Sequence, residues 1–254
     1  MFILKYIFLF LGELFYILGF YNFSLYFYSF VYRDNPKDLE CLEMIISCNG
    51  YLGNYDSVME YSDKYLKIDK NNFDIYYFKA QALFIFERYE ESLKYYDLAL
   101  DIDSDNVLGL MGKTNVLLKL DEDELFIEYC EKILDMDPDN FYILYNMGYF
   151  YFKKDKLDLA LQFVNEALKI KKSSLAALLL KSRILADLDL FDDSLVVLNS
   201  LLRKDPNNVD VLFFKALVLM DTGEIDEAKK CANHILELDS NFKDVSEIKY
   251  ILNS

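Results

Sequence analysis

Residues 100–106 read Leu-Asp-Ile-Asp-Ser-Asp-Asn, and residues 134–140, which lie 34 positions later, read Leu-Asp-Met-Asp-Pro-Asp-Asn. The chain holds only three prolines, Pro36, Pro138 and Pro206, and the spacings between them are whole multiples of 34. Proline interrupts helices, whereas Asp, Asn and Ser favour turns and helix caps. Boundaries that recur at this spacing predict an array of 34-residue repeats.

Seven consecutive blocks of 34 residues fit the chain without an insertion. Each block has a second break near its middle, such as Gly53-Asn54 or Thr222-Gly223, and apolar residues recur at helical spacing within the block. The pattern predicts two helices per block and an all-α solenoid that forms one continuous unit over residues 1–254, since repeats stack without a single central core. The blocks begin at Lys5, Leu39, Phe73, Val107, Phe141, Leu175 and Val209.

Small residues recur at two positions of the blocks and predict close contact between the two helices of each pair. Close-packed interiors penalise extra volume, so two helices approach closely only where side chains are small. The eighth position holds Gly12, Ala80, Gly148, Ser182 and Ala216, and the twentieth holds Ser24, Ser92, Ala160, Ser194 and Ala228.

These residues resemble the tetratricopeptide repeat, a 34-residue helix-turn-helix. Leu11-Gly12 and Met147-Gly148 are similar to its Leu-Gly pair, and the three prolines match its thirty-second position. The resemblance covers residues 5 to 242 and implies a right-handed solenoid, with residues 243–252 as the helix that caps the last repeat. The aromatic position of the family is matched by Tyr21, Tyr55, Tyr89 and Phe191, and its alanine by Ala160 and Ala228.

The resemblance also implies a binding groove, because the first helices of this family line a concave face. Tyrosine gives a large contact area with a polar tip, and asparagine amides hold peptide backbones. Met111, Ala176 and Leu180 stand where the basic residues of a carboxylate clamp belong, so we expect no such clamp. The mapping places Tyr77, Phe78, Gln81, Met111, Asn115, Tyr142, Tyr145, Asn146, Tyr149 and Arg183 in the groove.

Composition argues against nucleic-acid binding, catalysis and bound cofactors. The net charge of −16 disfavours contact with phosphate backbones. The single histidine, His234, has no serine or cysteine at a triad spacing, so we expect no catalytic residue. The four cysteines form no Cys-x-x-Cys pair and lie on apolar helix faces, which predicts buried free thiols without a metal site. We expect no cofactor and no enzyme activity.

The N-terminal segment leaves alternatives open. From Tyr6 to Tyr32 the only charged residue is Glu13, and such a run has the length of a membrane span. The first alanine of the chain is Ala80, so no Ala-x-Ala cleavage site follows the run, and a cleaved signal peptide is not expected. Gly12, Gly19 and Pro36 match the later blocks, which favours a first repeat. The segment's apolar outer side predicts contact with a membrane, a partner or a second copy.

The sequence therefore predicts a non-catalytic protein–protein interaction scaffold or adaptor that binds a peptide or a partner's helix, in the cytoplasm. One alternative is a membrane-associated assembly factor held by residues 1–32. Another is a non-catalytic subunit of an enzyme complex. Self-association through the first repeat is a further expectation.

Overall fold

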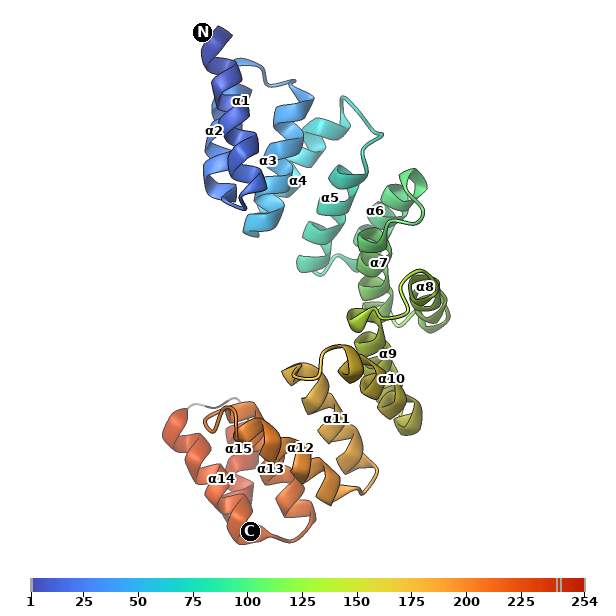
Figure 1. Cartoon of the computed structure of the whole chain (residues 1–254), viewed down its shortest axis with the longest axis vertical. Helices are drawn as coiled ribbons and strands as arrows, with labels where there is room; N and C mark the ends of the chain where they lie inside the picture. The colour runs from blue at the N-terminus through green and yellow to red at the C-terminus, as the bar shows by residue number, and fades with distance from the viewer. Residues whose placement is uncertain (1, 241, 243, 254) are drawn as a thin grey trace. The chain divides into compact units, whose positions relative to one another are not determined.

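The computed structural model describes residues 2–240, 242 and 244–253, and within them the chain forms fifteen helices and no strand. Consecutive helices follow one another as seven pairs, with α15 after the last (Figure 1). In six pairs the two helices pack along each other, and in the pair of α7 and α8 Lys113 donates a hydrogen bond to the Tyr129 hydroxyl. The predicted all-α fold of paired helices is confirmed. The pairs are α1 (Phe2–Ile17) with α2 (Tyr21–Asp34), α3 (Leu39–Leu52) with α4 (Tyr55–Leu66), α5 (Phe73–Ile85) with α6 (Tyr89–Ile102), α7 (Val107–Lys119) with α8 (Asp123–Met136), α9 (Phe141–Lys153) with α10 (Leu157–Ile170), α11 (Leu175–Asp187) with α12 (Phe191–Leu202), and α13 (Val209–Asp221) with α14 (Ile225–Leu238), before α15 (Val245–Asn253).

The chain divides into two compact units, residues 1–133 and residues 134–254. The first unit holds α1 to α7 and most of α8. The second begins in the last turn of α8 and holds α9 to α15. That residues 1–254 form a single solenoid remains a prediction.

Six first helices begin where the 34-residue blocks begin, and each is capped by the polar residue before it. Asn72, for example, accepts a hydrogen bond from the backbone N–H of Ile75 at 3.2 Å. Such a cap satisfies a donor that the helix leaves unpaired and is worth about 1 kcal/mol. The capping side chains are Asp38, Asn72, Asn106, Asn140, Ser174 and Asn208.

The turn inside each pair is formed by a residue with left-handed backbone at the fifteenth position of the block. Three glycines adopt this conformation without steric cost, whereas Glu87 and three aspartates adopt it with a Cβ atom present. The seven residues with positive φ are Gly19, Gly53, Glu87, Asp121, Asp155, Asp189 and Gly223.

The small residues bring the two helices of a pair into contact, as predicted. Ser92 on α6 donates a hydrogen bond to the Ala80 carbonyl on α5 at 2.7 Å, and Ser194 donates to the Ser182 carbonyl at 2.8 Å. A Cβ atom on Gly148 would stand 2.6 Å from the side chain of Val164. The serine hydroxyls reach the facing backbone only because these positions carry no larger side chain.

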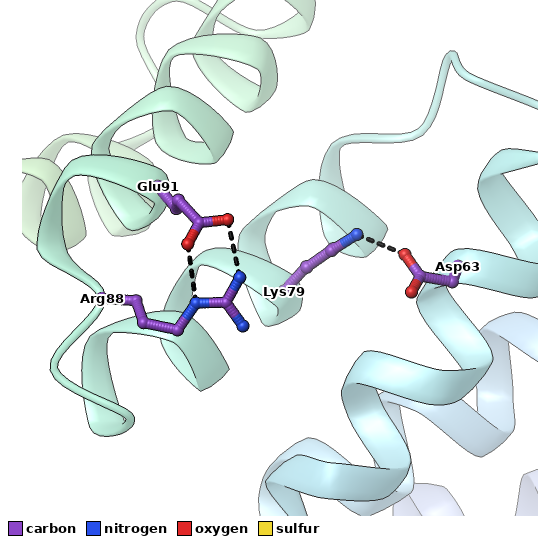
Figure 2. Close-up of polar contacts among 4 residues, drawn as sticks. All are labelled: Asp63, Lys79, Arg88 and Glu91. Atoms are coloured by element: carbon purple, nitrogen blue, oxygen red, sulfur yellow. Dashed lines mark hydrogen bonds and ion pairs between the residues drawn. The ribbon is translucent and has the colours of Figure 1, made fainter.

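Buried lysines join successive pairs in the first unit. Lys79 on α5 forms an ion pair with Asp63 on α4 (Figure 2). The Lys79 Nζ also lies 4.4 Å from the ring centre of Tyr95. The same arrangement recurs 34 residues later, where Lys113 pairs with Asp97 at 2.6 Å and lies over Tyr129. Figure 2 also shows the exposed pair of Arg88 and Glu91, held by two hydrogen bonds of 2.7 Å.

The last pair is covered by α15. Ile248 and Ile251 are fully buried on it, and Phe242 packs edge-on against Phe213 with ring centres 5.3 Å apart. The predicted capping helix spans residues 243–252; residue 243 lies outside the described residues, and the observed helix is Val245–Asn253.

The first pair packs on the second through one side. Tyr28 and Val31 on α2 are buried with Cys41 and Ile45 on α3. A turn at Gly19 divides the apolar N-terminal segment into two short helices. Among the helices of the described residues, none has both the length and the apolar character needed to cross a membrane. All four cysteines are buried free thiols, as predicted.

Candidate functional site

Four of the predicted groove residues line one hollow of about 220 Å³ in the first unit. Tyr77 and Gln81 come from α5, and Met111 and Asn115 from α7. Gln81 donates a hydrogen bond from Nε2 to the Tyr77 hydroxyl at 2.7 Å. Two adjacent first helices therefore bring together residues that are 34 apart in the chain.

The lining of this hollow carries no charged residue. Tyr55, Tyr96 and Leu108 contribute most of the remaining wall, together with Phe84, Ile85 and Gly112. Burial raises the pKa of Tyr77, and the neighbouring Tyr51 raises it further, so the phenol is protonated at neutral pH. The hollow can accept an apolar side chain and offers hydroxyl and amide groups at its edge.

Phe78 lies apart from the hollow. It is 6% exposed, and its ring packs edge-on against Tyr51 with centres 5.6 Å apart. A Cβ atom on Gly50 of α3 would stand 2.4 Å from this ring. The absence of a side chain at Gly50 therefore makes room for the Phe78 ring. Phe78 contributes to packing between the second and third pairs.

In the second unit, the three predicted tyrosines of α9 have different surroundings. Tyr142 is 55% exposed and lies under the Lys171 ammonium group, 4.3 Å from its ring centre. Tyr149 is exposed as well. Tyr145 is half-buried against the cluster of the fifth and sixth pairs, and burial raises its pKa. Tyr142 and Tyr149 are therefore available to a partner, whereas Tyr145 also contributes to packing. Asn146 is half-buried on the same helix.

Arg183 lies in a second hollow, of about 240 Å³, within the second unit. Its guanidinium carbon is 4.5 Å from the ring centre of Phe214 and 5.7 Å from that of Phe152. Asp187 and Asp221 line the same hollow. Burial raises the pKa of Asp187, and Arg183 only partly offsets this rise. This hollow is charged, in contrast to the hollow of the first unit.

Some lining residues were not among the predicted groove residues. Asp187 and Asp221 both stand at the thirteenth position of their blocks, and this shared position is the sequence signal for them. Tyr96 comes from the second helix of the third pair. Its ring reaches the hollow because Gly112 has no side chain: a Cβ atom there would stand 2.3 Å from the ring. Within the described residues, no three His, Cys, Asp or Glu side chains gather as a metal site.

Three family models described as tetratricopeptide repeat match residues 73–106, 129–162 and 185–251, which together cover more than half of the chain. None of the curated proteins matches the sequence.

Solved structures with the same fold extend over most of the chain. A tetratricopeptide repeat protein from Parabacteroides merdae ATCC 43184 has 10% identity and a TM-score of 0.74, with 99% of each chain covered. PilW, described as a widely conserved type IV pilus biogenesis factor, has 17% identity and a TM-score of 0.70 over 80% of this chain and 94% of its own. YrrB, described as a TPR protein with an unusual peptide-binding site, has 20% identity and a TM-score of 0.57 over 74% of this chain and 97% of its own.

Proposed function

The chain belongs to the tetratricopeptide repeat family. We propose that it is a non-catalytic interaction scaffold that binds a peptide or a partner's helix on the surface formed by the first helix of each pair. The observation that carries the proposal is the uncharged hollow formed by Tyr77, Gln81, Met111 and Asn115. YrrB, which shares the fold, is described as having a peptide-binding site.

The hollow favours a partner with an apolar anchor residue. On a chain of net charge −16, an uncharged and concave surface with aromatic and aliphatic side chains in its wall is a place where desolvation costs little. The Tyr77 hydroxyl accepts from Gln81 and can donate its proton to a peptide carbonyl. The partner is therefore a segment with one buried apolar side chain and a backbone acceptor beside it.

The test is selection from a displayed library of random peptides, comparing the wild-type chain with Met111→Lys. A charge inside the hollow should reduce enrichment of apolar-anchored peptides at least tenfold. Leu125→Lys is the matched control, because Leu125 is exposed on α8 outside the hollow. Equal enrichment by Met111→Lys, with unchanged circular dichroism, would contradict the proposal.

The same peptide selection also tests the charged hollow at Arg183. Arg183→Ala should change the peptides that the second unit enriches and leave those of the first unit unchanged. Tyr142→Ala and Tyr149→Ala test the exposed tyrosines of α9 in the same way.

A second candidate function is a membrane-associated assembly factor held by residues 1–32. The observation that favours it is the exposure of large apolar side chains on the first pair, among them Phe10, Ile17 and Phe20. Self-association through this pair, a role as the subunit of an enzyme complex and a cytoplasmic location stay predictions.

A further inference from the structure

The turn between α1 and α2 differs from the turns that join the helices of the later pairs. Residues 17–20 read Ile-Leu-Gly-Phe, and Ile17, Leu18 and Phe20 are exposed, Ile17 by 74%. Every later turn carries a charged residue or, in the second pair, Asn54. The same backbone turn forms elsewhere with an aspartate at its left-handed position, so turn geometry does not require an apolar tip.

Exposed apolar side chains cover the sides of the hairpin as well as its tip. Ile7 and Leu14 stand at the third and tenth positions of their block, and the matching residues of all later blocks are buried. In the second and third pairs, this is the side that the preceding pair covers. Tyr26 lies on the outer side of α2, where four of the six later blocks place a charged residue: Glu60, Lys94, Glu128 and Lys230. A second protein chain would cover one of these sides, whereas a lipid phase that surrounds the tip also reaches Leu14, three residues from Ile17. Ile7 lies about 15 Å from Ile17 along the helix axis and would remain outside the lipid.

The charges of the hairpin complement a bilayer. No charged residue occurs from residue 14 to residue 32. Glu13 stands four residues from Ile17, which is about 6 Å along the helix axis. The other charges of the hairpin, Lys5, Arg33 and Asp34, lie near the opposite end, where Lys5 forms an ion pair with Asp38. Interfacial helices bury their apolar side by about 5–10 Å, so an inserted tip would leave Glu13 among the headgroups. The net charge of −16 disfavours anionic lipid, whereas the Glu13 carboxylate suits a choline group.

Three tyrosines gather in one cluster beside the tip, on the side of the second pair. Tyr21 stacks on Tyr51 of the next pair with ring centres 4.6 Å apart, and Tyr16 packs edge-on against both. Tyrosine is enriched at membrane–water interfaces, because its ring is apolar and its hydroxyl is polar.

We propose that the α1–α2 hairpin docks on a bilayer of zwitterionic lipid and inserts its tip, Ile17, Leu18 and Phe20, into the upper acyl region of one leaflet. This inference rests on the second candidate function and adds to it the lipid class and the mode of contact. The rest of the chain, with its peptide-binding surface, remains in water.

The chain contains no tryptophan, so a single introduced tryptophan reports its own surroundings. Phe20→Trp places the probe at the tip, and Leu190→Trp places it at the matching position of the sixth pair, which is also exposed. With phosphatidylcholine vesicles, the Phe20→Trp emission should shift to the blue and be quenched by lipids brominated near the headgroup. The Leu190→Trp emission should not change.

A flotation assay with the full chain separates membrane association from tip insertion. The double substitution Ile17→Asp and Phe20→Glu introduces residue types that later pairs already carry at the matching positions, Asp187 and Glu122. The fold should therefore tolerate it. It should lower the fraction that floats with the vesicles at least tenfold, with unchanged circular dichroism.

Three outcomes would overturn the inference. If the wild-type chain does not float, both the membrane-associated function and the insertion fail. If it floats but Phe20→Trp is not quenched, membrane association stands and tip insertion fails. If the blue shift appears without vesicles and grows with protein concentration, a second copy covers the tip instead of lipid.

Discussion

The first and third pairs are built on the same 34-residue pattern, yet the same residue type has opposite surroundings in them. Ile7 and Ile75 both stand at the third position of a block; Ile7 is 46% exposed and Ile75 is fully buried. Among the described residues, the third pair packs against the second and the fourth, whereas the first pair packs against the second. In a repeat array, the position in the block sets which way a side chain points, and the neighbouring pair decides whether it is buried.

Truncation of these two isoleucines should show the largest contrast. Ile75→Ala removes fully buried methyl groups and leaves a cavity, so we expect the free energy of unfolding to fall by about 2–5 kcal/mol. Ile7→Ala should lower it by less than about 1 kcal/mol in dilute buffer. Urea unfolding followed by circular dichroism measures both changes. A large loss for Ile7→Ala would mean that something covers this side in solution.

The partly buried ion pair of Lys79 and Asp63, between the second and third pairs, should show the next effect. Asp63→Ala leaves the Lys79 ammonium group without its partner in a nearly buried site. A fully buried pair would lose more, but Asp63 is half exposed, so we expect a loss of about 1–2 kcal/mol. Glu60→Ala on the same helix removes the exposed pair with Lys64 and should cost less than about 0.5 kcal/mol. Equal costs in urea unfolding would contradict the importance of burial.

The pair of Lys79 and Asp63 also gives a pH dependence. Burial lowers the pKa of Lys79, but the hydrogen bonds to Asp63 and Tyr95 outweigh it and raise the pKa above the usual lysine value. The contribution of Lys79 to stability is therefore complete below about pH 10 and is lost as the pH rises through its folded pKa.

The cysteines distinguish the end of the array from its interior. Burial raises the pKa of the Cys41 and Cys130 thiols to about 12, so the free energy of unfolding falls as the pH rises above about 9, by about 1–2 kcal/mol for each thiol at pH 10. Unfolding at pH 8 and pH 10 checks this value. In variants that keep one cysteine, alkylation of Cys41 should be faster than that of Cys130, because Cys41 is covered by the end pair. Equal rates would show that the first pair is docked as firmly as the others.

Glycine at the left-handed turn position should produce the smallest change. Glu87→Gly relieves the cost of a Cβ atom at φ 59°, so we expect a gain of up to about 1 kcal/mol. Gly53→Ala makes the opposite change in the neighbouring pair and should lose a similar amount. Thermal unfolding of the two variants measures the difference. A loss with Glu87→Gly would mean that the Glu87 side chain stabilises the turn.

Local chemistry made most of the fold predictable. The polar residue at each block end predicted a cap, and Asn72 and Asn106 cap α5 and α7. The small residues predicted contact within pairs, which Ser92 and Ala80 make. These features depend on residues within one block, so their spacing in the sequence is sufficient.

The candidate site was predictable only in part. Tyr77 and Gln81 point into a common hollow, because positions one helical turn apart share a face. Phe78 was assigned to the groove from its position in the block, but it is buried, because Gly50 in the preceding pair leaves room for its ring. The contribution of Tyr96 depends on Gly112 in the same way. A single small residue in a neighbouring pair redirects a side chain, and the repeat pattern does not encode that event.

The sequence by itself determined where the helices begin and end, since caps and left-handed turns act through adjacent backbone groups. It also determined the order of the pairs, because each block follows the previous one without an insertion. Only the tertiary structure decided which of the equivalent apolar residues are buried. It leaves Ile7, Leu14 and Ile17 of the first pair exposed. The physical reason is that burial depends on the volume and presence of a neighbouring pair, which equivalent positions do not share.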